Sequence, residues 1–117
     1  MLVDNKKISE IDKPYIIAEL SANHGGNIER AKKSIEIVAK TGVSAVKLQT
    51  YTPDTMTIKS NLPDFRINDG LWAGRTLYDL YSEAYTPFEW HQELFEHAHA
   101  HGITIFSTPF DESAVDL

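Results

Sequence analysis

The sequence contains no cysteine, which excludes disulfide bonds and any chemistry that needs a thiolate. It also lacks an apolar run close to the roughly 20 residues of a membrane-spanning helix, and its N-terminus lacks the apolar core of a signal peptide. Basic residues are in the minority, 11 against 17 acidic ones, for a formal net charge of −6. This balance does not favour nucleic-acid or membrane partners. We expect a soluble, cytoplasmic protein.

The 117 residues, 42% of them hydrophobic, are enough for one domain with a buried core. Apolar patterns predict three strands, each followed by a helix. Asn27 and Asp111 are expected to cap the first and last of these helices, and Thr86-Pro87 to begin the middle one. A weak strand or hairpin is expected at 6–11, and the three main strands at 15–20, 43–49 and 103–106.

Alternating strands and helices indicate an α/β fold with parallel strands and right-handed crossovers. Doubly wound sheets and (β/α)8 barrels both begin in this way. A barrel needs about 250 residues, so three strand–helix units are less than half of one. The last predicted helix is cut short at Leu117, and we therefore expect a truncated chain.

Polar residues gather where the three strands end, and the carboxyl ends of adjacent parallel strands share one rim where ligands bind. Sequence-distant groups are therefore expected to form one site. Its candidate members are Glu19, Ser21, Asn23 and His24 from the first strand, Lys47 and Gln49 from the second, and Ser107, Thr108 and Asp111 from the third.

Strand alternation places Lys47 and Gln49 on one face, opposite the apolar Val46 and Leu48. Because the apolar face should meet the helices, Lys47 is expected to point away from them, toward the interior of a barrel. A lysine there needs a negative partner. That partner is either Glu19, as a structural ion pair, or the phosphate or carboxylate of a ligand.

Three other features have plain structural interpretations. His97, His99 and His101 suit the negative end of a helix, and no metal-binding pattern such as HExxH accompanies them. Ser107-Thr108 before a proline is a common turn as well as a possible phosphate contact. The long connection 50–86, with its GLWAGR segment, is either a lid over a ligand or a buried anchor.

Four ordered segments, KPYIIAELSANHGG, AVKLQTYTPDTMT, GLWAGRTLYDLYSEAYTPFEWH and ITIFSTPFDESAVDL, resemble the pseudaminic acid synthases, a branch of the N-acetylneuraminate (sialic acid) synthase family. The first and last are similar to the whole family, and the middle two to the pseudaminate branch. The resemblance implies a (β/α)8 TIM barrel, usually followed by an antifreeze-like C-terminal domain, in a domain-swapped homodimer. Residues 1–117 would then be the N-terminal part of the barrel domain, with the remaining barrel and the C-terminal domain outside them.

The resemblance also implies a reaction. Such enzymes condense phosphoenolpyruvate with an N-acetylated amino sugar, 2,4-diacetamido-2,4,6-trideoxy-altrose in the pseudaminate branch, with the help of a divalent metal, Mn²⁺ or Mg²⁺. The enol carbon attacks the aldehyde, water attacks the resulting cation, and phosphate leaves with C–O cleavage. The partners implied are these small-molecule substrates.

Residue by residue, the resemblance assigns Glu19 to catalysis near the acceptor sugar and the water shell of the metal. Lys47 and Thr108 match contacts to phosphoenolpyruvate, with Ser107 a weaker neighbour. Gln49 and Asn23 match the acceptor-sugar pocket, whereas His24 has no assigned role. The metal ligands of the family lie in later strands, beyond Leu117, so none is expected among these residues.

Several functions remain open at this stage. The alternatives are a synthase for N-acetylneuraminate or legionaminate, and a non-catalytic fragment or assembly module. We expect the 117 residues alone not to turn over, because they would hold only part of the site.

Overall fold

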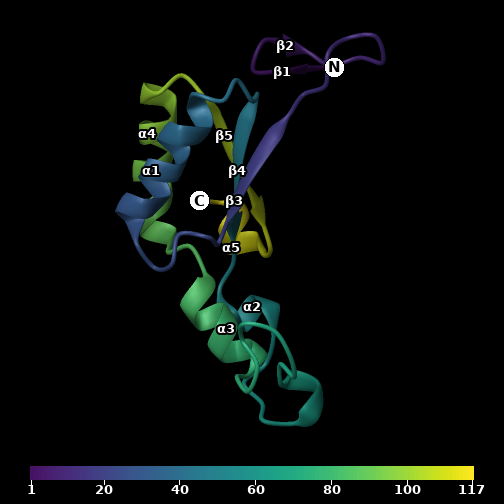
Figure 1. The fold of residues 1–117 in the computed structure, drawn as a ribbon, viewed down its shortest axis with the longest axis vertical. Coiled ribbons are helices and arrows are strands. Elements are labelled where there is room, and N and C mark those ends of the chain that lie inside the picture. The colour runs from purple at the N-terminus through teal and green to yellow at the C-terminus, as the bar shows by residue number, and fades with distance from the viewer.

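Three parallel strands form the centre of the computed structural model, which describes residues 1–117 (Figure 1). The sheet order is β3–β4–β5, so each strand neighbours the next along the chain. The three predicted strands are confirmed with shifted ends, since β4 and β5 stay paired as far as Thr50 and Pro109. The strands are β3 (Ile17–Ser21), β4 (Ala45–Thr50) and β5 (Thr104–Pro109).

Two helices, α1 (Ile28–Ala39) and α4 (His91–Ala100), lie side by side on one face of this sheet (Figure 1). They cover the apolar face of β4 as predicted. Their side chains, Ile35 from α1 and Leu94 from α4, are fully buried together with Val46 and Leu48. Burying each such side chain contributes about 1.5–3 kcal/mol, so this cluster holds the layers together.

The predicted connection 50–86 forms an arm beyond the carboxyl ends of the strands (Figure 1). It contains a helix at 77–84, whose N-cap Thr76 accepts a hydrogen bond from the Asp79 amide at 3.1 Å. The elements of this arm are α2 (Pro53–Met56), the 3-10 turn η1 (Pro63–Phe65) and α3 (Leu77–Ala84). No helix in the structure has both the length and the apolar character that crossing a membrane requires.

Two local predictions need correction. The N-terminal hairpin pairs β1 (Leu2–Val3) with β2 (Lys6–Lys7) rather than occupying 6–11, because Asp4 and Asn5 adopt positive φ and close a tight turn. Thr86 does not cap α4. A 3-10 turn, η2 (Phe88–Trp90), precedes that helix.

The caps predicted at the other two helices are confirmed. The Asn27 side chain accepts from the Arg30 amide at 3.0 Å at the start of α1. The Asp111 side chain accepts from the Ala114 amide at 2.9 Å at the start of α5 (Glu112–Val115). Short polar side chains at these positions satisfy backbone donors that have no partner within the helix.

Candidate functional site

The face of the sheet opposite α1 and α4 brings together four of the predicted site residues. Glu19 on β3 is the register partner of Lys47 on β4, and Gln49 on β4 is the register partner of Thr108 on β5. Register partners in a sheet point to the same face, and residues two apart along a strand do so too. Glu19, Lys47, Gln49 and Thr108 therefore line one continuous surface near the carboxyl ends of the strands.

Lys47 and Glu19 form an ion pair, with Nζ 3.2 Å from Oε2. The side chains are 28% and 43% exposed, so water reaches both charges. Of the two partners left open for Lys47, Glu19 or a ligand anion, Glu19 is the one in contact here. Since solvent screens the pair, an incoming anion can replace the Glu19 carboxylate at Lys47 without a large desolvation cost.

Gln49 is oriented by a neighbouring strand. The Ser21 hydroxyl donates to Gln49 Oε1 at 2.7 Å. Ser21 has a φ of 53°, and the register of β3 against β4 shifts between Glu19 and Ser21. A serine in the left-handed region is strained, and such strain is concentrated at functional positions. The bond engages the amide oxygen of Gln49 and leaves its Nε2 available to donate to a ligand.

Ser107 lies on the other face of β5, away from Thr108. Its hydroxyl is 2.5 Å from Thr50 Oγ1, which in turn is 2.6 Å from Nε2 of the buried His91. Nδ1 of His91 donates to the carbonyl of Pro87 at 3.1 Å, so in the neutral ring Nε2 is the acceptor. Burial lowers the pKa of His91. The Ser107 side chain is therefore part of a chain of hydrogen bonds between the sheet and α4.

The first loop is held by Asn23 and His24. The Asn23 side chain is exposed and donates to the carbonyl of Leu20 at 3.1 Å, which closes the turn after β3. His24 is completely buried. Its Nδ1 accepts from the Gly26 amide at 3.1 Å, and its Nε2 lies 3.2 Å from Thr86 Oγ1. Burial lowers its pKa, so the neutral ring fixes the loop to the segment before α4.

Three buried polar residues of these networks, Thr50, Thr86 and His91, were missed by sequence reasoning. The available signal was His91 itself, a polar side chain on the face of a helix that otherwise packs Leu94 and Ala98 against the sheet. Buried polar groups need hydrogen-bond partners. A polar residue at the face of a helix that packs on the sheet therefore predicts a hydrogen-bond partner on a strand, but which residue it is depends on the packing.

The GLWAGR segment of the arm is not buried. Leu71 is 94% exposed, and the Arg75 guanidinium stacks 4.9 Å from the ring centroid of the half-buried Trp72. Arg75 also pairs with Glu83 of α3 at 2.5 Å. The segment is thus exposed at Leu71 and half-buried at Trp72, and both the lid and the anchor interpretations stay predictions.

The rim does not supply a complete set of metal ligands. Of the four residues that line this surface, only Glu19 has a carboxylate, and it already forms an ion pair with Lys47. Both ring nitrogens of His24 are engaged within the protein. A divalent cation needs several oxygen or imidazole ligands, and these residues do not provide them.

Sequence comparison shows that the chain belongs to the NeuB family, which it matches over residues 34–117. It is 53% identical, over 90% of its length, to a pseudaminic acid synthase of Campylobacter jejuni, of which it covers 31%. It is 33% identical, over 97% of its length, to an N,N'-diacetyllegionaminic acid synthase of Legionella pneumophila, of which it covers 33%. The chain thus spans about a third of the length of these curated relatives.

The fold is shared with a solved structure. The N-acetylneuraminic acid (sialic acid) synthetase of Leptospira borgpetersenii superposes on 99% of the chain with a TM-score of 0.79 at 24% identity, and the chain covers 36% of that structure. The predicted fold class is confirmed. The architecture is α/β, the N-terminal portion of a TIM barrel with about three strand–helix units.

Proposed function

We propose that the protein containing these residues is a pseudaminic acid synthase that condenses phosphoenolpyruvate with 2,4-diacetamido-2,4,6-trideoxy-altrose. The observation that supports this most directly is the cation–carboxylate pair of Lys47 and Glu19 on the rim, beside Gln49 and Thr108. The higher identity to a pseudaminic acid synthase than to a legionaminic acid synthase, 53% against 33%, favours this acceptor.

In this proposal Lys47 binds the anionic groups of phosphoenolpyruvate, and the Thr108 hydroxyl donates to the same ligand. Glu19 stands near the acceptor sugar, where a carboxylate stabilises the cationic carbon that develops. Gln49 donates from Nε2 to the sugar. Asn23 shapes the first loop at the acceptor pocket, and Ser107 supports Thr108 from the opposite face of β5.

The proposed chemistry forms one carbon–carbon bond and breaks one carbon–oxygen bond. The enol carbon of phosphoenolpyruvate attacks the open-chain aldehyde, whose oxygen takes up a proton. Water adds to the cationic carbon left behind, and inorganic phosphate departs with its bridging oxygen. A cation fixed next to a carboxylate serves both steps, because the cation binds the anionic groups and the carboxylate stabilises the cationic carbon.

The remainder of the site is proposed to come from outside these residues. We propose that 1–117 form the N-terminal part of the barrel domain, with the other strands and an antifreeze-like domain elsewhere in a homodimeric, cytoplasmic protein. Mn²⁺ or Mg²⁺ would be held by ligands in those other strands. The 117 residues alone should therefore release no phosphate from the two substrates.

The test is Lys47→Ala in the whole protein, with phosphoenolpyruvate binding measured by calorimetry. Removing the cation should weaken binding by about 2–5 kcal/mol, or about 30- to 5,000-fold. Lys40→Ala changes an exposed lysine at the end of α1 and serves as the matched control. Unchanged affinity in Lys47→Ala would place Lys47 outside the site.

Two alternatives give different results. A synthase for N-acetylneuraminate or legionaminate would turn over those acceptor sugars faster than the altrose sugar when all are compared on the whole protein. A non-catalytic assembly module would fail to bind phosphoenolpyruvate in the presence of Mn²⁺. The identity of 33% to a legionaminic acid synthase makes the first comparison worthwhile.

A further inference from the structure

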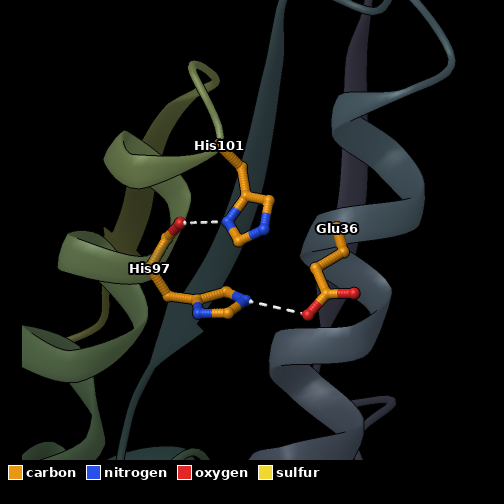
Figure 2. Close-up of side chains that lie close together, drawn as sticks. All are labelled: Glu36, His97 and His101. Carbon is orange, nitrogen blue, oxygen red and sulfur yellow. Dashed lines mark hydrogen bonds and ion pairs between the residues drawn. The ribbon is translucent and has the colours of Figure 1, made fainter.

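The seam between α1 and α4 is unusually rich in charged and titratable side chains. Lys32 on α1 pairs with Glu29 of its own helix at 3.0 Å and with Glu93 of α4. One turn and more further along α1, Glu36 faces two histidines of α4 (Figure 2). The contact between Lys32 and Glu93 is a simple ion pair across the seam. The group of Glu36 and the two histidines instead combines a carboxylate with two imidazoles, which are metal-binding side chains.

Glu36, His97 and His101 each present one ligand atom, and the three atoms lie within 4.8 Å of one another. His97 and His101 are four residues apart, so they stack on one face of α4 with ring centroids 4.4 Å apart. Nε2 of His97 lies 3.5 Å from Glu36 Oε1 (Figure 2). Two imidazoles at this helical spacing are a recurrent zinc-binding arrangement, and Glu36 adds the carboxylate from a second helix.

The hydrogen bonds around the cluster leave its ligand atoms open. Nδ1 of His101 donates to the carbonyl of His97 at 2.8 Å, which leaves the lone pair on Nε2, facing α1 (Figure 2). Nε2 of His97 is buried and has no hydrogen-bond partner. A backbone carbonyl that fixes the ring tautomer is the usual outer support of a metal-binding histidine.

The Glu36 carboxylate is also held in place from outside. Lys33 donates to Oε2 at 2.8 Å. Its other oxygen, Oε1, remains directed at His97. The carboxylate is thus oriented from outside the cluster, as metal-binding carboxylates usually are.

We propose that Glu36, His97 and His101 bind a Zn²⁺ ion that joins α1 to α4. Two imidazole nitrogens and one carboxylate oxygen suit Zn²⁺ and its transition-metal neighbours rather than Mg²⁺ or Ca²⁺. Zinc–ligand bonds of about 2.0–2.1 Å place ligand atoms about 3.3 Å apart in a tetrahedron. The His97–Glu36 separation already matches, and the exposed His101 ring closes the rest by turning about its side-chain bonds. Water takes the fourth position.

The position in the fold indicates a structural ion. Glu36 lies near the end of α1, and His97 and His101 lie at the end of α4, beside the strand beginnings and opposite the rim with Glu19 and Lys47 (Figure 1). The amino ends of the strands in such barrels serve stability rather than catalysis. This ion is therefore separate from any metal used in the proposed reaction, and it would raise stability by binding only the folded state.

The experiment measures Zn²⁺ and Co²⁺ binding to chelator-treated protein, with thermal unfolding and the visible spectrum of Co²⁺ as readouts. Wild type should bind an equivalent of Zn²⁺ that raises Tm, and Co²⁺ at this site should give tetrahedral absorption. The variant with His97→Gln and His101→Gln should lose that equivalent, its Tm rise and that absorption. His99→Gln on the same helix, outside the cluster, should keep all three.

Glu36→Gln supplies a second, milder test because it keeps the shape of the side chain. It should weaken Zn²⁺ binding at least about tenfold. If the double histidine variant does not fold, Zn²⁺ binding to the metal-free Glu36→Gln variant decides the question instead. The proposal is overturned if the histidine variant or Glu36→Gln binds Zn²⁺ with the stoichiometry and affinity of wild type. Phosphoenolpyruvate binding should not change in any of these variants, which separates this test from that of the proposed reaction.

Discussion

The Thr50 hydroxyl lies 2.6 Å from Nε2 of His91, and this contact ties the end of β4 to the start of α4 in the interior of the protein. Both side chains are buried, and Ser107 extends the chain of hydrogen bonds to β5. The network thus connects two strands that end at the candidate rim to the helix layer behind them. Its neutral histidine and two hydroxyls satisfy one another without a buried charge.

Thr50→Val should lower the free energy of unfolding by about 1–3 kcal/mol. The substitution keeps the shape of the side chain but leaves Nε2 of His91 without its donor, and a buried unsatisfied group is costly. Thr50→Ser keeps the hydroxyl and is the control. Urea denaturation measures both. A valine variant as stable as wild type would show that the hydrogen bond contributes nothing net.

Acidification should destabilise the protein through His24 and His91. Burial lowers the pKa of each below the ordinary value of 6.5, so both rings stay neutral in the folded state while the unfolded chain takes up protons. The stability is complete above about pH 6.5 and falls as the pH drops below it. The slope approaches about 1.4 kcal/mol per pH unit for each additional proton bound by the unfolded chain.

Thermal unfolding between pH 8 and pH 5 measures this slope. His24→Gln should flatten it, since one of the two buried titrating rings is removed. His99→Gln, which changes an exposed histidine, should leave the slope as it is. If the Tm of the wild type stays constant as the pH is lowered from 6.5 to 5, the assignment of two neutral buried rings is contradicted.

Ile35→Ala should be strongly destabilising, whereas Ile37→Ala on the same helix should be almost neutral. Ile35 is fully buried against the sheet, and its truncation leaves a cavity that costs about 2–5 kcal/mol. Ile37 is 55% exposed and loses little packing. Chemical denaturation of the two variants compares them directly. Equal losses would mean that α1 does not pack through the face seen here.

Glu19→Gln should separate stability from activity. Its ion pair with Lys47 is partly exposed, so the free energy of unfolding should change by less than about 1 kcal/mol. In the whole protein, turnover should fall by about a hundredfold or more if the carboxylate stabilises the developing cation. Phosphate release under saturating substrates measures it. Wild-type turnover would remove Glu19 from the proposed mechanism.

The sequence by itself determined the order of elements and the common face of Lys47 and Gln49. Local chemistry was sufficient there. Asn27 and Asp111 cap helices through contacts three residues away, and strand alternation follows from the backbone. The resemblance to sialic acid synthases also came from the sequence alone, because the order and spacing of motifs can be compared without knowledge of the packing.

Only the tertiary structure decided which distant polar groups meet. Thr86 has the local pattern of a helix cap, yet it contacts the buried His24, which is 62 residues away in the sequence. Likewise, α4 carries Glu93 four residues before His97, yet the carboxylate that lies beside His97 and His101 is Glu36, which arrives from α1 through helix packing. Local patterns report hydrogen bonds within a turn or a strand. Partners from separate elements are fixed by how the apolar faces of those elements pack.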